Sequence, residues 1–332
     1  MGECVSPLGE MLKFVQRSSA ENGDGAFESR GGLCHGVVRQ CPTRDSKTWA
    51  GQSLGTTTAF NEESKLPSKY WADWTSPAFS EIDVSQAVAV IPLGATEQHG
   101  PHLPLSVDAL IVDAIVQRAL AMLGDQDPVL VLPTQTVGLS TEHIAFAGTL
   151  SASPEWVMKS WLELGDCVAR SGVKKLLFFN AHGGHPGLME VVARELRQRS
   201  ELLVYSSSWY QLPMADAVRA LFSEEEHRFG VHGGAIETSM VMAIDPKLVH
   251  TEHLQNFPSR SEVRAKNYAI LGNGHSAKFG WLAQDYNPLG AMGDARLASA
   301  DKGEQLLAQA AQGLKDLLLE LIRLPLDTIH TR

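Results

Sequence analysis

Three short segments of the chain combine histidine and carboxylate side chains with glycine. They read GATEQHGPH (residues 94–102), NAHGGH (residues 180–185) and HGGAIETS (residues 232–239). Glycine lets the backbone turn sharply and approach a ligand closely. Imidazole and carboxylate groups bind divalent ions such as zinc, manganese and iron. The segments therefore indicate a metal site assembled from distant parts of the chain.

The spacing of the acidic and histidine side chains fits a pair of ions. Glu97 and His99 are two residues apart, so in an extended segment both side chains point to the same side. Asp108 begins a predicted helix after a turn that contains proline, where its two oxygens could bridge two ions. His182 follows a buried strand, where an imidazole is expected to bind something. Two adjacent ions would lower the pKa of a bound water and polarise a carbonyl group.

Each of these residues also has a simpler interpretation. A single Glu or His after a strand is more often a solvated or capping residue than a metal ligand. Asp108 could stabilise a helix N-terminus, and His182 could bond a backbone carbonyl. The metal interpretation is favoured because separate segments carry the same kinds of residue beside glycine.

The elements that must position these residues follow a β/α pattern. Short apolar runs predict strands at residues 87–93, 129–132, 174–180 and 202–206. Apolar residues at helical spacing predict helices at residues 107–123, 154–168, 186–199, 213–222, 234–244 and 297–324, whereas residues 247–295 predict loops. Alternating strands and helices predict a mainly parallel sheet with helices on both faces. Ligands of such sheets bind at the carboxyl ends of the strands, where the first two segments lie.

Composition argues against several classes of function. The 332 residues carry a formal net charge of -10 at pH 7, which disfavours a general nucleic-acid binder and a polybasic membrane surface. No apolar run reaches the roughly 20 residues that a membrane-spanning helix requires. The four cysteines form no C-x-x-C pair, so neither a disulfide framework nor a thiolate zinc site is expected. We therefore expect a protein of the reducing cytoplasm.

The first 68 residues differ from the rest of the chain. They are rich in Gly, Ser and Thr, show no sustained periodicity, and carry acidic and basic residues in near balance. The apolar run at residues 11–15 is too short for a signal peptide. We expect residues 1–68 to be a disordered extension and residues 69–325 to form the folded domain.

Some residues give weaker signals. His143, in the segment GLSTEH (residues 138–143), could line a pocket or be an ordinary loop histidine. Trp209, just after a predicted strand, could cover a substrate or simply pack in the core. The Gly-x-Gly at Gly272 and Gly274 follows no convincing strand, so a phosphate-binding loop is not expected.

The sequence resembles the creatininase family of amidohydrolases from about residue 70 to residue 323. The resemblance rests on residues 92–104, Asp108, residues 138–143, Phe146, Gly148, Thr149, residues 180–184 and residues 232–239. It implies a three-layer α/β/α sandwich with a mainly parallel central sheet, often assembled as a homohexamer. It also implies a binuclear centre of zinc, manganese or iron.

The resemblance assigns roles to the residues of that centre. Glu97 and His182 would bind one ion, His99 would bind the other, and Asp108 would bridge them. His232 matches the proton-relay histidine of the family, which could protonate the leaving nitrogen as a general acid.

The fifth metal ligand departs from the family pattern. Creatininase has a Glu where this chain has Gly184, and many relatives have a Glu where this chain has Ala235. Glu237 is then expected to be the fifth ligand and, with His232, a catalytic residue. His185 is a further candidate ligand.

The substrate pocket also departs from creatininase. Trp209 matches the first of two pocket tryptophans, but Arg228 stands beside Phe229 where the second would fall. Arg228 would favour an anionic substrate. The expected activity is metal-dependent hydrolysis of a small amide-type C–N bond. The alternatives are a formamide hydrolase of flavin or deazaflavin biosynthesis, a small-peptide metallopeptidase, and an inactive binding protein on the same fold.

Overall fold

The computed structural model describes residues 66–330. The predicted disordered extension lies outside these residues, apart from its last three positions. Of those three, Leu66 is buried and packs in the core.

A sheet of four parallel strands forms the centre of the domain. The strands are β1 (Val88–Leu93), β2 (Val129–Val131), β3 (Lys175–Asn180) and β4 (Leu203–Ser208), in the order β2-β1-β3-β4. Every residue of β1 and β3 is buried, as the continuous apolar runs predicted. The predicted parallel sheet is confirmed.

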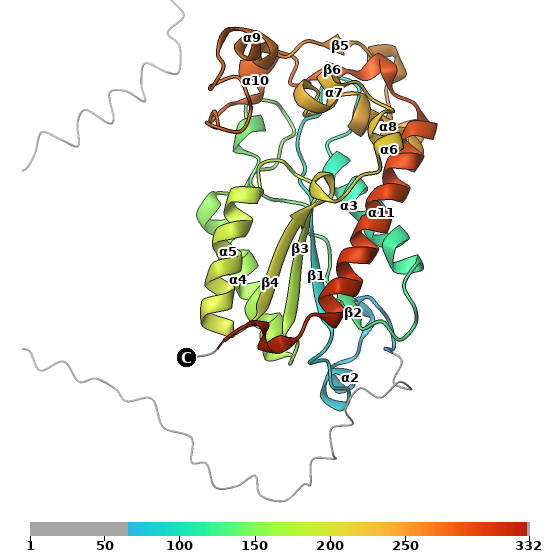
Figure 1. Ribbon diagram of the computed structural model, residues 1–332, viewed down its shortest axis with the longest axis vertical. Helices are drawn as coiled ribbons and strands as arrows, with labels where there is room; N and C mark the ends of the chain where they lie inside the picture. The colour runs from blue at the N-terminus through green and yellow to red at the C-terminus, as the bar shows by residue number, and fades with distance from the viewer. Residues whose placement is uncertain (1–65, 331–332) are drawn as a thin grey trace, which may run out of the picture. The chain divides into compact units, whose positions relative to one another are not determined.

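Helices cover both faces of this sheet, as Figure 1 shows. One face carries α4 (Pro154–Arg170) and α5 (Pro186–Ser200). The other face carries α3 (Val107–Ala121) and α11 (Ala300–Arg323), and α8 (Ala235–Ile244) packs against both of these helices. Side chains alternate between the faces of a strand, so Phe178 and Phe179 of β3 enter different hydrophobic clusters. The domain is therefore the predicted three-layer α/β/α sandwich.

The strand order places a binding crevice beside β1 and β3. After β1 the chain crosses to β2 on one side of β1, and later returns to β3 on the other side. Ligands of open parallel sheets bind outside the carboxyl ends of the strands at such a switch point. The loops that follow Leu93 and Asn180 leave the sheet at this crevice.

The region after β4 differs from the prediction. Within the predicted helix 213–222 only α6 (Asp216–Arg219) is helical, because the preceding residue Ala215 has an extended backbone. Residues 247–295 were predicted as loops but include α9 (Arg260–Asn267) and α10 (Ala283–Tyr286). The last helix begins at Ala300 rather than near residue 297, because the Ser299 side chain caps it by accepting from Lys302 N.

The remaining elements are short. They are α2 (Ser76–Glu81), α7 (Glu224–Phe229), the antiparallel strands β5 (Asn256–Phe257) and β6 (Gly293–Asp294), and 3₁₀ turns at Trp71–Asp73, Thr141–His143, Trp209–Gln211, Pro246–Leu248, Thr251–His253, Ala295–Leu297 and Leu326–Thr328. Among the described residues, no helix combines the length and apolar character needed to span a membrane.

Candidate metal centre

The five predicted metal ligands come together at the crevice. Glu97 and His99 follow β1, His182 follows β3, and Asp108 and Glu237 lie in the first turns of α3 and α8. Donor atoms of Glu97, Asp108 and His182 lie within 4.8 Å of one another, and so do those of His99, Asp108 and Glu237. Asp108 belongs to both groups. The arrangement fits two ions that share one carboxylate.

The two oxygens of Asp108 face different histidines. Asp108 Oδ1 lies 3.6 Å from His99 Nε2, whereas Asp108 Oδ2 lies 3.4 Å from His182 Nδ1. His182 Nδ1 also lies 3.1 Å from Glu97 Oε1, and His99 Nε2 lies 3.9 Å from Glu237 Oε2. Asp108 thus occupies the central position between the two groups of donor atoms.

The second nitrogen of each histidine is held by a backbone carbonyl. His99 Nδ1 donates to Glu97 O at 3.1 Å, and His182 Nε2 donates to Leu139 O at 2.9 Å. These bonds orient both rings, so that His99 Nε2 and His182 Nδ1 are directed at the carboxylates. Histidine ligands of metals are oriented in this way by a hydrogen bond from the other ring nitrogen.

The carboxylates of the centre are buried without an ordinary cation. The exposed fractions of Glu97 and Asp108 are 0% and 2%. Both oxygens of Glu97, Asp108 Oδ2 and His99 Nε2 have no hydrogen-bond partner in the described part of the chain. Within that part, every ion-pair partner of Glu97, Asp108 and Glu237 is a histidine. Buried charge without compensation is costly, so the donor set fits divalent cations.

His99 and His182 carry the positive charge of the centre when no ion is present. Burial lowers the pKa of His99, but the Asp108 hydrogen bond and the neighbouring carboxylates outweigh burial and raise it to about 9. Burial likewise opposes protonation of His182, yet Glu97 and Asp108 raise its pKa well above the ordinary value. Burial raises the pKa of Glu237 to about 7. The raised pKa values of His99 and His182 reflect carboxylates that need a nearby positive charge.

Glu237 is fixed by the start of its own helix. Gly233, which adopts a φ of 63°, donates its N–H to Glu237 Oε2 at 2.6 Å. A positive φ favours glycine, and an acidic side chain in the first turn caps the helix. This capping bond holds the carboxylate beside His99. By contrast, Ala235 is fully buried and packs in the core.

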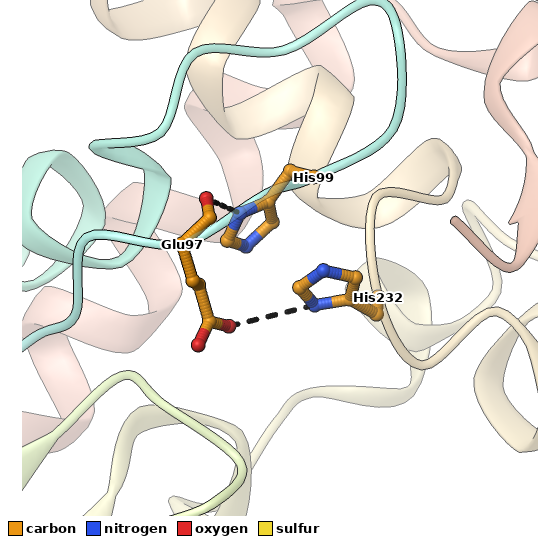
Figure 2. A group of neighbouring side chains, drawn as sticks. All are labelled: Glu97, His99 and His232. Atoms are coloured by element: carbon orange, nitrogen blue, oxygen red, sulfur yellow. Dashed lines mark hydrogen bonds and ion pairs between the residues drawn. The ribbon is translucent and has the colours of Figure 1, made fainter. Parts of the chain in front are cut away.

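His232 lies over the ring of His99. Figure 2 shows both rings beside the Glu97 carboxylate. The ring centroids of His232 and His99 are 4.0 Å apart. His232 Nε2 donates to Gln98 O at 2.6 Å, and Nδ1 lies 3.8 Å from Glu97 Oε1. Burial lowers the pKa of His232 well below its ordinary value, so the ring is neutral with its Nδ1 lone pair towards the centre.

The three predicted substrate-binding residues all line one cavity of about 780 Å³. His143 lies at its metal side, because His143 Nε2 is 3.3 Å from Glu97 Oε1. Trp209 is buried, as in the packing interpretation, but it also lines the cavity. Arg228 is exposed, stacks on Phe229 at 4.9 Å and donates to Gly272 O at 2.9 Å.

His185 has both ring nitrogens occupied. Nδ1 donates to Asn180 Oδ1 at 2.9 Å, and Nε2 accepts from Leu139 N at 3.2 Å. The ring packs edge-on against Trp161 with centroids 4.9 Å apart. His185 therefore has no ring nitrogen left for an ion, and it supports the loop that carries His182.

Glu142 and Trp281 are among the cavity residues that were not predicted. Glu142 lies next to His143 in the sequence, so the segment was recognised but this carboxylate was not singled out. Trp281 comes from the region predicted as loops, and its ring meets His143 edge-on at 6.2 Å. It also stacks on Tyr286 at 4.8 Å. No spacing signal links Trp281 to the metal ligands.

The chain was also compared with known protein families. The model of the creatininase family, described as creatinine amidohydrolase, matches residues 72–318. The chain belongs to the creatininase family. It is therefore a hydrolase that acts on carbon–nitrogen bonds.

Creatininase relatives with different substrates resemble the chain. A mycofactocin precursor peptide peptidase of Mycobacterium ulcerans is 32% identical over 237 residues, which cover 69% of this chain and 84% of the relative. A creatinine amidohydrolase of Pseudomonas putida is 25% identical over 254 residues, which cover 73% of this chain and 92% of the relative.

Solved creatininases share the fold. A crystal structure of creatinine amidohydrolase has a TM-score of 0.62 and 25% identity, and the match covers 78% of this chain and 100% of that one. A zinc–zinc form of a creatininase variant has a TM-score of 0.62 at 24% identity, covering 78% of this chain and 100% of the other. A manganese form has a TM-score of 0.63 at 23% identity, covering 77% and 100%.

Proposed function

We propose that this creatininase-family enzyme hydrolyses an amide C–N bond with two divalent ions held by Glu97, His99, Asp108, His182 and Glu237. The observation that carries the proposal is the sharing of Asp108 by two groups of buried donor atoms. When bound, the ions would activate a water molecule and polarise the substrate carbonyl. The known zinc and manganese forms of creatininases make those metals the first to test.

His232 is proposed to move the proton. Its Nε2–H is held by Gln98 O, so its Nδ1 is the nitrogen that can accept a proton at the centre. Because its pKa is lowered by burial, the ring starts neutral and can then give the proton to the leaving nitrogen. Gln98 Nε2 also bonds His143 Nδ1 at 2.7 Å, which holds His143 beside Glu97.

The cavity favours a substrate larger than creatinine. Its volume of about 780 Å³ lies within the roughly 300–1,000 Å³ of typical ligand pockets. Aromatic side chains of Trp209, Tyr210 and Trp281 line it, and they could hold an extended apolar group. The peptidase relative points in the same direction. A short peptide is therefore our second candidate substrate, beside a small amide or formamide.

Arg228 is proposed to bind an anionic group of the substrate. It lines the cavity and is exposed, and none of the ion pairs found in the described residues involves it. Arg219 lines the same cavity but is paired with Glu224 at 2.8 Å, so it offers a matched control. Arg228→Ala should raise the KM for an anionic substrate by about two- to fivefold and leave the KM for a neutral substrate unchanged. If the wild type and Arg228→Ala have the same KM for the anionic substrate, Arg228 does not have this role.

A substrate panel tests the proposed activity. Chelated protein, reloaded with zinc or manganese, is assayed on creatinine-like amides, on formamidopyrimidines and on short peptides, with Glu97→Gln as the inactive control. Turnover that requires metal and is lost in Glu97→Gln is expected. Turnover that persists in the chelated protein and in Glu97→Gln would contradict the proposal.

Assembly and location rest on the resemblance. We propose a homohexamer in the cytoplasm, as expected for the family. Light scattering coupled to size-exclusion chromatography would measure the oligomer, and a monomer at working concentration would contradict it.

A further inference from the structure

Glu142 approaches His182 from the side opposite the candidate ions. It lies in the 3₁₀ turn Thr141–His143, and its Oε1 is 3.5 Å from His182 Nε2. The other ring nitrogen, His182 Nδ1, faces Glu97 and Asp108. The imidazole therefore stands between the centre on one side and the Glu142 carboxylate on the other.

Gly184 leaves the space that Glu142 occupies. A Cβ atom at position 184 would overlap Glu142 Oε1 and would lie 2.5 Å from His182 Nε2 and 2.8 Å from Leu139 O. Only glycine allows this close approach of the carboxylate to the ring. The absence of a side chain at 184 and the placement of Glu142 are thus two parts of one arrangement.

Ordinary structural roles do not account for Glu142. Its side chain is 14% exposed, and in the described residues it forms no ion pair with Lys or Arg. It sits in a turn of three residues, which has little helix dipole to stabilise a carboxylate. Among the described ion pairs its partner is His182. A half-buried carboxylate with this partner acts on that ring.

We propose that Glu142 is a positioning residue that holds His182 in the tautomer needed to bind an ion. Leu139 O accepts the Nε2–H of His182, and the Glu142 carboxylate, 3.5 Å from the same nitrogen, attracts this N–H. Together they leave the lone pair on Nδ1. A carboxylate behind a ligating imidazole fixes the ring and makes it a stronger donor. This inference rests on the proposed two-metal function.

Zinc affinity tests the proposal. Competition of the full-length protein with a chromophoric chelator gives the Kd for Zn²⁺. Loss of an outer carboxylate typically costs about 10–100-fold in metal affinity, and that loss is expected for Glu142→Ala. Glu142→Gln, which keeps the shape and an acceptor oxygen, should lose less. The melting temperature of each metal-free variant should match that of the wild type.

A control separates this role from general effects on the cavity. Glu224 lines the same cavity but is exposed and paired with Arg219, so Glu224→Ala should bind zinc as the wild type does. Wild-type affinity in Glu142→Ala, or in Glu142→Gln if the alanine variant does not fold, would overturn the positioning role and leave the two-metal function intact. A wild-type protein that binds no zinc would overturn both.

Discussion

His182 Nδ1 lies 3.1 Å from Glu97 Oε1, and the two residues follow neighbouring strands of the sheet. Strands β1 and β3 end in register, with Leu93 opposite Asn180. The chain therefore leaves both strands at the same level, and a few residues later the two side chains meet. The sheet register, rather than any local sequence contact, places them together.

Glu226 should stabilise the start of α8. Its buried carboxylate accepts from Ala235 N at 2.5 Å and from Asp294 N at 3.0 Å, and so ties this helix to β6. Hydrogen bonds to a charged group contribute about 1.5–3 kcal/mol, offset in part by burial, which raises the pKa of Glu226. Urea unfolding of Glu226→Ala should show a loss of about 2 kcal/mol. The exposed neighbour Glu225→Ala should change stability by less than about 0.5 kcal/mol; equal effects would contradict this role.

Lys175 should hold the end of α11 against the sheet. The side chain is 1% exposed, and its Nζ donates to Ile322 O at 2.7 Å. The last carbonyls of a helix have no partner within the helix, so this bond satisfies one of them. Lys175→Met keeps the apolar stem and should cost about 1–2 kcal/mol in urea unfolding. Lys174→Met, at the exposed adjacent position, is the control. A Lys175→Met protein as stable as the control would show that the bond adds nothing.

His102 should make the metal-free protein less stable at mildly acidic pH. Burial lowers its pKa to about 4, from 6.5, so between these values the unfolded chain binds a proton that the folded chain does not. The stability that His102 supplies is complete above pH 6.5 and is lost as the pH falls towards 4. Between pH 7.5 and pH 5.0, the loss of unfolding free energy that is due to His102 is about 2 kcal/mol.

Urea unfolding midpoints in the presence of a chelator measure how much His102 contributes to the pH dependence of stability. The wild type should lose more stability than His102→Gln between pH 7.5 and 5.0, because the glutamine does not titrate. His102 Nε2 bonds Thr238 Oγ1 at 3.0 Å, and the substitution alters this bond. The two proteins are therefore compared by the change in their stability between the two pH values, not by their stability at one pH. Parallel pH dependence in the two proteins would show that His102 is not held neutral.

The central strands could be predicted from the sequence because they are buried on both faces. Continuous apolar runs marked β1 and β3 to within one residue. The edge strand β4 runs on to Ser208, two residues past the apolar signal, because backbone pairing with β3 continues where its side chains are polar. The helix predicted at 213–222 was wrong in its extent, because only Asp216–Arg219 is helical and the apolar residues on either side pack in the core outside a helix.

Glu97, His99 and His182 could be predicted because they follow strand ends beside glycine. Asp108 was predicted at the start of a helix, and Glu237 from the family resemblance. Residues whose position depends on long-range packing could not. Trp281 reaches the cavity through its stacking on Tyr286, and Glu142 reaches His182 through the space at Gly184. Neither contact leaves a periodic pattern, so only the folded chain reveals it.

Metal content per subunit tests the two-ion centre most directly. Elemental analysis after zinc loading and desalting would compare the wild type, Asp108→Ala and the control Asp113→Ala on the same helix, where Asp113 bonds Thr134 instead. We predict about two ions in the wild type and the control, and a clear loss in Asp108→Ala. No zinc in the wild type, or equal zinc in all three proteins, would contradict the shared-carboxylate centre.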